Sequence, residues 1–279
     1  REAAPIELDS GQSTDPEFYS RGNFTLTDDG NAQRFAELYA NKVHYVVGRK
    51  DEWRMWDGRR HRPVSSVYIL ELVRNTVRSI NTEARHTSDR NVRGALRAHA
   101  LASQTTSRLT SLLHLIASEP VIRCEFGDFD VNPYLLNCMN GTLDVETLQF
   151  YPHRLEDKLS KLCPVDYVAG AKSAVLEQFL EQKFPDPEVR EYVQRSVGYS
   201  ATGDDREEAV FIVTGPGGTG KSTLIGGVRL VLGDYAASAA YDTWVLKRDA
   251  AGGARPDIVR LRGKRFVASI DAGKKKRLD

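Results

Sequence analysis

The stretch "VFIVTGPGGTGKSTLIGG", residues 210–227, decides how this chain is expected to fold. It passes from an apolar segment through a glycine-rich loop into an amphipathic segment. Residues Gly215 to Ser222 match the pattern Gly-x-x-x-x-Gly-Lys-Ser/Thr, in which loop N–H groups and the start of a helix surround a phosphate. The apolar segment predicts a β-strand and the amphipathic segment predicts a helix. The sequence therefore predicts an α/β fold of the phosphate-loop type.

Each position of this loop has an expected task. Lys221 is expected to reach the β- and γ-phosphates of a nucleotide, and the hydroxyl of Ser222 is expected to hold Mg²⁺. The predicted ligands are therefore ATP and Mg²⁺. A glycine-rich turn that binds nothing is the alternative, but a lysine followed by serine serves little packing purpose there. The candidate nucleotide-binding residues are Gly215, Pro216, Gly217, Gly218, Thr219, Gly220, Lys221, Ser222 and Thr223.

A second acidic element follows in "GKRFVASID", residues 263–271. Its apolar residues predict a buried strand, and Asp271 stands at the carboxyl end, where ligands bind in α/β sheets. Asp271 is therefore the candidate second Mg²⁺ ligand, and with Lys221 it forms the candidate catalytic pair. The alternative is that Asp271 caps a turn before Ala272.

Composition limits the class of protein. The chain has 279 residues, of which 41% are hydrophobic and 28% charged, with a net charge of +1, as in an ordinary globular protein. The first residues form no signal peptide, and no run of about 18 apolar residues predicts a membrane span, so we expect a cytoplasmic protein. The spacing of Cys124, Cys138 and Cys163 predicts reduced core thiols. The six histidines show no metal-ligand spacing.

Four regions follow from the hydrophobic pattern. A short helix is expected near residues 31–41, and two helices between residues 65 and 118 are expected to separate near residues 81–91. Asn140-Gly141 predicts a β-hairpin, and Asp186 with Pro187 predicts a helix start. The predicted regions are a loose lead-in (1–33), a mainly helical domain (34–118), a small β-rich connector (119–170) and a phosphate-loop domain (171–279).

Two basic segments are candidate nucleic-acid contacts. The first, "KDEWRMWDGRRHRPVS", predicts a hairpin with Gly58 in its turn. Its aromatic and basic residues either bind single-stranded bases or anchor the hairpin, and we favour anchoring. They are Trp53, Arg54, Trp56, Arg59, Arg60 and Arg62. In the second segment, residues 247–279 hold eleven Lys and Arg against four Asp, densest at Lys274–Arg277. This run is either a solvated face or a phosphate contact.

Several blocks in order resemble the phage, plasmid and poxvirus primase-helicases, whose motor is a superfamily 3 helicase of the AAA+ group. "NAQRFAELYANKVHYV" and "WRMWDGRRHR" are similar to the start of the helical domain before that motor. "NPYLLNCMNGTLDVETLQFYPHRLEDKLSKLCPVDY" resembles its connector. "GYSATGDDREEAVFIVTGPGGTGKST" and "RPDIVRLRGKRFVASIDAGKKKRLD" look like its phosphate-loop and second acidic motifs. The resemblance runs from about residue 31 to residue 279.

The resemblance implies a fold and an activity. The fold is an α/β, incomplete phosphate-loop AAA+ motor preceded by a mainly helical domain and a small β-rich connector. The activity is ATP-driven DNA unwinding by a homo-oligomeric ring of six subunits, with ATP bound between neighbours. The family carries Glu where this chain has Asp271, and places a third motif, a pore hairpin and an arginine finger further on. We therefore expect the chain to be a piece of a longer protein.

Three functions remain open from the sequence. The first is an ATP-binding DNA replication protein that acts as an ATPase and DNA helicase in its full-length form. The second is a module that binds nucleotide, DNA or a partner subunit without turning ATP over. The third is a small-molecule kinase, which the long helical and β-rich segment before the loop disfavours.

Overall fold

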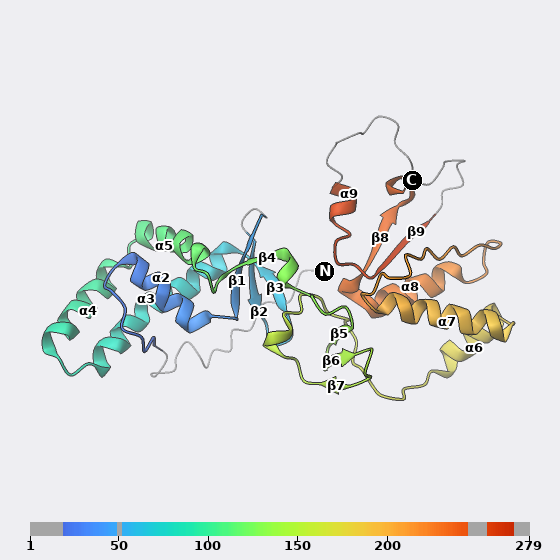
Figure 1. Cartoon of the computed structure of the whole chain (residues 1–279), viewed down its shortest axis with the longest axis horizontal. Helices are drawn as coiled ribbons and strands as arrows, with labels where there is room; N and C mark the ends of the chain where they lie inside the picture. The colour runs from blue at the N-terminus through green and yellow to red at the C-terminus, as the bar shows by residue number, and fades with distance from the viewer. Residues whose placement is uncertain (1–18, 49–51, 245–255, 271–279) are drawn as a thin grey trace. The chain divides into compact units, whose positions relative to one another are not determined.

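The computed structural model describes residues 19–48, 52–244 and 256–270. The chain divides into two compact units, Arg1–Phe129 and Asp130–Asp279 (Figure 1). Each unit has its own hydrophobic core. Within the described ranges, no helix is both long enough and apolar enough to cross a bilayer.

Four helices form most of the first unit: α2 (Asp28–Tyr39), α3 (Ser66–His86), α4 (Arg90–Ala102) and α5 (Thr106–Ser118). The side chains of Thr27, Ser65 and Asp89 accept backbone N–H bonds at the first three helix starts, as N-cap residues do. The predicted break near residues 81–91 is confirmed. A second break, at 103–105, was not predicted; there the polar residues Ser-Gln-Thr interrupt the apolar period.

A four-stranded sheet completes this unit, in the order β3-β2-β1-β4. Its strands are β1 (Val43–Val47), β2 (Trp53–Trp56), β3 (His61–Val64) and β4 (Arg123–Glu125). Strands β2 and β3 form the predicted hairpin, with Gly58 at a φ of 90° in its turn. Strand β4 pairs with β1 in parallel, although it lies in the predicted connector. The first unit thus combines its four helices with this sheet.

The core of the first unit lies between the sheet and helices α2, α3 and α5. It buries apolar side chains that recur at helical spacing, and those from α3 are Ile69, Leu72, Val73 and Val77. Its largest fully buried members are Phe35, Ile69, Ile116, Ile122 and Val43.

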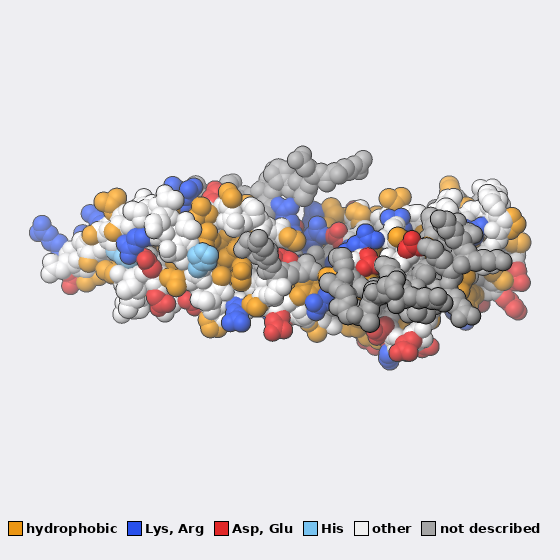
Figure 2. Space-filling model, turned by 90° about the horizontal axis from the view of Figure 1, so that it is seen from above, with side chains coloured by type: hydrophobic (Ala, Val, Ile, Leu, Met, Phe, Trp, Pro, Cys, Tyr) orange, Lys and Arg blue, Asp and Glu red, His pale blue; other side chains and the backbone are white. Residues whose placement is uncertain are grey.

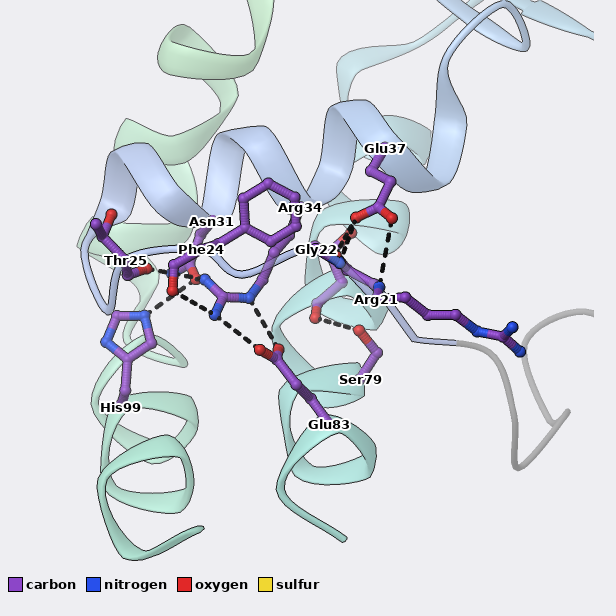
Figure 3. A network of polar contacts seen from close by, with 12 residues as sticks. Arg21, Gly22, Phe24, Thr25, Asn31, Arg34, Glu37, Ser79, Glu83 and His99 are labelled. Atoms are coloured by element: carbon purple, nitrogen blue, oxygen red, sulfur yellow. Dashed lines mark hydrogen bonds and ion pairs between the residues drawn. The ribbon is translucent and has the colours of Figure 1, made fainter. Parts of the chain in front are cut away.

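A buried arginine joins the lead-in to the helices (Figure 3). Arg34 on α2 is fully buried and makes a two-pronged ion pair with Glu83 on α3, at 3.0 and 3.1 Å. It also donates to the carbonyl oxygens of Phe24 and Thr25, at 3.3 and 3.0 Å. Residues 20–27, predicted as part of a loose lead-in, are thereby attached to the helices.

The second unit begins with a three-stranded antiparallel sheet, in the order β5-β6-β7. Its strands are β5 (Leu135–Cys138), β6 (Gly141–Asp144) and β7 (Phe150–Tyr151). The predicted hairpin is confirmed, but Cys138 pairs with Gly141, so that Met139 and Asn140 form its loop. The amide of Asn140 exchanges two hydrogen bonds with the backbone of Tyr167, at 2.8 and 2.9 Å.

The remaining elements surround the glycine-rich loop. The helices are α6 (Ala174–Lys183), α7 (Pro187–Ala201), α8 (Lys221–Leu232) and α9 (Pro256–Val259). Strands β8 (Ala236–Ala240) and β9 (Phe266–Ile270) pair in parallel. Short 3-10 turns lie at Phe126–Asp128, Leu155–Asp157, Gly233–Tyr235 and Tyr241–Thr243. The predicted helix start at Asp186 and Pro187 is confirmed by α7. The predicted helix after the loop is confirmed by α8. The strand predicted in residues 263–271 forms as β9, but residues 266–269 are half-buried rather than buried.

One predicted strand does not form. Residues 209–214, just before the loop, have no strand pairing within the described part of the chain. Val210 and Ile212 are 83% and 73% exposed, and Phe211 contacts the rings of Tyr192 and Tyr199. An apolar segment becomes a stable parallel strand only when neighbours supply both its hydrogen bonds and its burial, and the described sheet of this region has only β8 and β9.

Tyr235 lies at the centre of the second core. It is fully buried, and its hydroxyl accepts a hydrogen bond from the N–H of Asn137 at 3.2 Å. The guanidinium of Arg265 lies 4.4 Å from the Tyr235 ring centroid and donates to the carbonyl oxygens of Leu135 and Ala201. Strand β5, helix α7 and the start of β9 are thus joined. All three cysteines are buried free thiols, as predicted.

Candidate phosphate-binding site

The glycine-rich loop has a backbone that needs glycine. Gly215, Gly218 and Gly220 have φ values of 147°, 78° and 87°, in a region that residues with a side chain rarely adopt. Gly220 caps helix α8, which begins at Lys221. The loop therefore leads directly into a helix N-terminus, whose free N–H groups and dipole favour an anion.

Lys221 folds back into the loop. Its Nζ donates to the carbonyl oxygens of Gly215 and Pro216, at 2.8 and 2.7 Å, and to the hydroxyl of Thr219, at 3.0 Å. That hydroxyl in turn donates to the carbonyl oxygen of Pro216 at 3.0 Å. The ammonium group is thus held among loop oxygens, and the loop itself is exposed. A phosphate can reach it without displacing any packed side chain.

The predicted metal ligands are only partly described. Ser222 and Thr223 are exposed on the first turn of α8, where a hydroxyl is open to solvent. Asp271 lies outside the described residues, as does the basic run Lys274–Arg277. Elsewhere in the described ranges, no three His, Cys, Asp or Glu side chains are arranged to hold a metal ion.

Helix α6 contributes two neighbours that the sequence did not predict. A β-carbon built on Gly220 would lie 3.1 Å from the ring of Phe179 and 3.2 Å from Cγ of Lys183. Phe179 therefore packs against the end of the loop, and Lys183 brings a second cationic side chain beside it. The available signal is their spacing, since residues four apart share one face of a helix.

The aromatic and basic hairpin has a structural role. Trp53 is 4% exposed and belongs to the first core. Arg54 is buried, pairs with Glu52 at 2.8 Å and lies over the rings of Phe126 and Phe129. The anchoring interpretation is confirmed for Trp53, but its arginines are not all in solvent: Arg54 is buried, and Arg60 and Arg62 are half-buried beside Asp57.

Known proteins resemble the chain over its first two thirds. Residues 32–185 match the family described as D5 N terminal like. Over 145 residues the chain is 32% identical to "Putative helicase 121R" of Invertebrate iridescent virus 3, across 50% of this chain and 15% of that protein. Over 140 residues it is 27% identical to "Putative helicase L207/L206" of Acanthamoeba polyphaga mimivirus, across 49% of this chain and 15% of that protein.

The match to more than half of the chain shows that it belongs to the D5 N-terminal-like family of phage and viral primase-helicases. The chain spans only a small part of the length of these curated relatives. The matched region ends at residue 185, before the glycine-rich loop, and includes helix α6.

Proposed function

We propose that this chain binds ATP at residues 215–223 and belongs to the helicase portion of a DNA replication protein. In its full-length form this protein would couple ATP hydrolysis to DNA unwinding as an AAA+ motor of superfamily 3. The observation that best supports ATP binding is the position of Lys221, whose ammonium group is held among loop oxygens at the start of helix α8.

The loop residues fit a nucleotide phosphate. Phosphate oxygens would replace the carbonyl oxygens of Gly215 and Pro216 as hydrogen-bond acceptors of Lys221. They would also accept hydrogen bonds from the N–H groups at the start of α8. The positive charge of Lys221 would offset phosphate charge, while the glycines leave the backbone open to approach. Lys183 would add a second positive charge beside Gly220.

The residues that would hold Mg²⁺ are Ser222 and Asp271. The exposed hydroxyl of Ser222 suits a hard cation that prefers oxygen ligands. Bound Mg²⁺ would neutralise charge on the β- and γ-phosphates. This role of Asp271 remains a proposal from the sequence.

Family membership supports the part of the proposal that concerns DNA. The two viral relatives carry helicase in their names, so we propose DNA as the macromolecular partner. A homo-oligomeric ring of six subunits, with ATP between neighbours, is the assembly that we propose for the full-length protein.

One observation favours a second candidate function, that of a nucleotide- or DNA-binding module without turnover. The segment before the loop is not paired in a sheet, and Val210 and Ile212 are exposed. In a working motor this segment transmits the position of the loop to the sheet. An unpaired segment would leave binding possible but coupling weak.

Nucleotide binding by the chain and by Lys221→Ala tests the proposal. The wild type should bind ATP, and the variant should bind roughly 10- to 100-fold more weakly, the effect of losing a hydrogen bond to a charged group. Lys172→Ala, at an exposed lysine outside the glycine-rich loop, is the matched control. Equal affinity of all three proteins would refute the site, and binding without hydrolysis in the presence of single-stranded DNA would favour the second function.

A further inference from the structure

Helix α3 carries a basic stripe on its solvent face. Arg74, Arg78 and Arg85 are exposed and follow one another at spacings of four and seven residues, which places them on one side of the helix. The core residues of α3, such as Val73 and Val77, lie on a different face. These arginines are thus not members of the hydrophobic core.

Two of these arginines line a hollow. Arg74 and Arg78 form it together with Gln104 from the α4–α5 junction and Leu109 from α5, and its volume is about 70 Å³. Leu109 is 6% exposed and gives the hollow an apolar side. The side-chain amide of Gln104 donates one N–H to the carbonyl oxygen of Ala100 at 3.1 Å, and an amide has a second N–H to offer. The space suits a phosphate group or a few waters, not an aromatic base.

Within the described ranges, the two guanidinium groups of this hollow take part in no ion pair. Some other arginines of the unit pair with an acidic residue, as Arg34 does with Glu83 and Arg108 does with Asp28. Like charges four residues apart on a helix repel by a few tenths of a kcal/mol. A bound anion would remove this repulsion.

General basicity does not account for the arrangement. On the face shown in Figure 2, Lys and Arg side chains are scattered over the molecule among acidic ones rather than gathered in one broad patch. Four residues of α3 rise by about 6 Å, which is comparable with the step between neighbouring phosphates of an extended single strand. Arg74 and Arg78 can therefore each meet one phosphate.

We propose that Arg74, Arg78 and Gln104 form a binding site for the phosphate backbone of single-stranded DNA. This inference rests on the proposed role at DNA but not on the glycine-rich loop. The guanidinium groups contact two successive phosphates, and the Gln104 amide donates to one of them. Because no base enters the hollow, binding is independent of sequence.

The test is binding of a labelled oligothymidylate by the whole chain at several salt concentrations. Arg74→Ala/Arg78→Ala should lower the slope of log K against log salt by about 1.4, the value for two single-strand phosphate contacts. If the variant and the wild type bind equally at 1 M salt, this difference in slope makes the variant bind roughly 25-fold more weakly than the wild type at 0.1 M salt. Arg90→Ala/Arg97→Ala is the matched control, because it removes the same charge from exposed positions of α4 outside the hollow.

Gln104→Leu adds a variant that leaves the charge unchanged and should weaken binding several-fold. ATP binding, measured on the same samples, should be unaffected in all variants. Equal losses in the two arginine pairs, or no loss in Arg74→Ala/Arg78→Ala, would overturn the site. A wild-type chain that binds ATP but no DNA would also overturn it while the phosphate loop stands. DNA binding through the hollow without ATP binding would support it and refute the loop.

Discussion

Replacing Arg34 by Met should destabilise the first unit more than any other surface or network substitution named here. The side chain is fully buried, and its removal leaves the Glu83 carboxylate without its ion pair. It also leaves the carbonyl oxygens of Phe24 and Thr25 without this donor. Breaking a buried pair from one side costs about 3–5 kcal/mol. Because the Glu83 side chain keeps 18% exposure to water, we expect the lower end, about 3 kcal/mol.

The assay is thermal unfolding followed by near-ultraviolet circular dichroism, in which Trp53 reports on the core of the first unit. A loss of about 3 kcal/mol corresponds to roughly 12 °C in Tm for a unit of this size. Arg108→Met is the control: its ion pair with Asp28 has 35% and 32% exposed side chains, so it should cost less than about 1 kcal/mol.

A double-substitution cycle isolates the pair. Arg34→Met combined with Glu83→Gln should cost less than the two single changes added together, since residues of one ion pair are coupled. If Arg34→Met shifts Tm no more than Arg108→Met, or if the two changes simply add, the network does not hold the lead-in as described.

Three further outcomes follow from the same structure. Gly220→Ala should disrupt the loop, because its φ of 87° disfavours a side chain and the added β-carbon would lie 3.1 Å from the ring of Phe179. Gly217→Ala meets no atom within 4 Å and should keep the fold by circular dichroism. The reverse order of stability would contradict the loop geometry. Burial, with help from nearby cationic arginines, lowers the pKa of His99 from 6.5. As the pH falls, the unfolded state therefore binds a proton at this imidazole before the folded state does, and the stability of the first unit should fall as pH drops below about 6.5. His99→Gln should make the Tm of the first unit depend less on pH in this range. Substituting Lys at Val210 and Ile212 should change stability by less than about 0.5 kcal/mol in the chain alone because both side chains are exposed, and a large loss in urea unfolding would show that the segment is buried.

Many features of the fold could be predicted from short stretches of adjacent residues. Asp186 followed by Pro187 marked the start of α7, and Gly58 marked the turn of the first hairpin, because caps and positive-φ turns are decided by neighbouring residues. The glycine-rich loop was likewise recognised from a contiguous pattern. Its ligand remains a prediction.

Contacts between distant residues were not predictable in the same way. Strand β4 pairs with β1 across the intervening residues 48–122, and nothing in the three-residue segment Arg123–Glu125 specifies that partner. The strand expected before the loop does not form for a related reason, because the apolar composition of a segment does not specify a neighbouring strand to pair with it. Phe179 and Lys183 beside Gly220, and Gln104 beside the arginines of α3, also depend on how separate helices pack.

Helix α8 has 12 residues and is about 18 Å long. One end is the candidate phosphate site at Lys221. The other end is fixed: the N–H of Asp234 donates to the carbonyl oxygen of Leu162, and Leu232 lies in the core with Cys163. A β-carbon on Gly233 would come within 2.3 Å of Pro164, so this junction has no slack. Helix α8 therefore connects the candidate phosphate site to the segment Leu162–Pro164, which is joined to strand β5 by the hydrogen bond from the N–H of Cys163 to the carbonyl oxygen of Asn137.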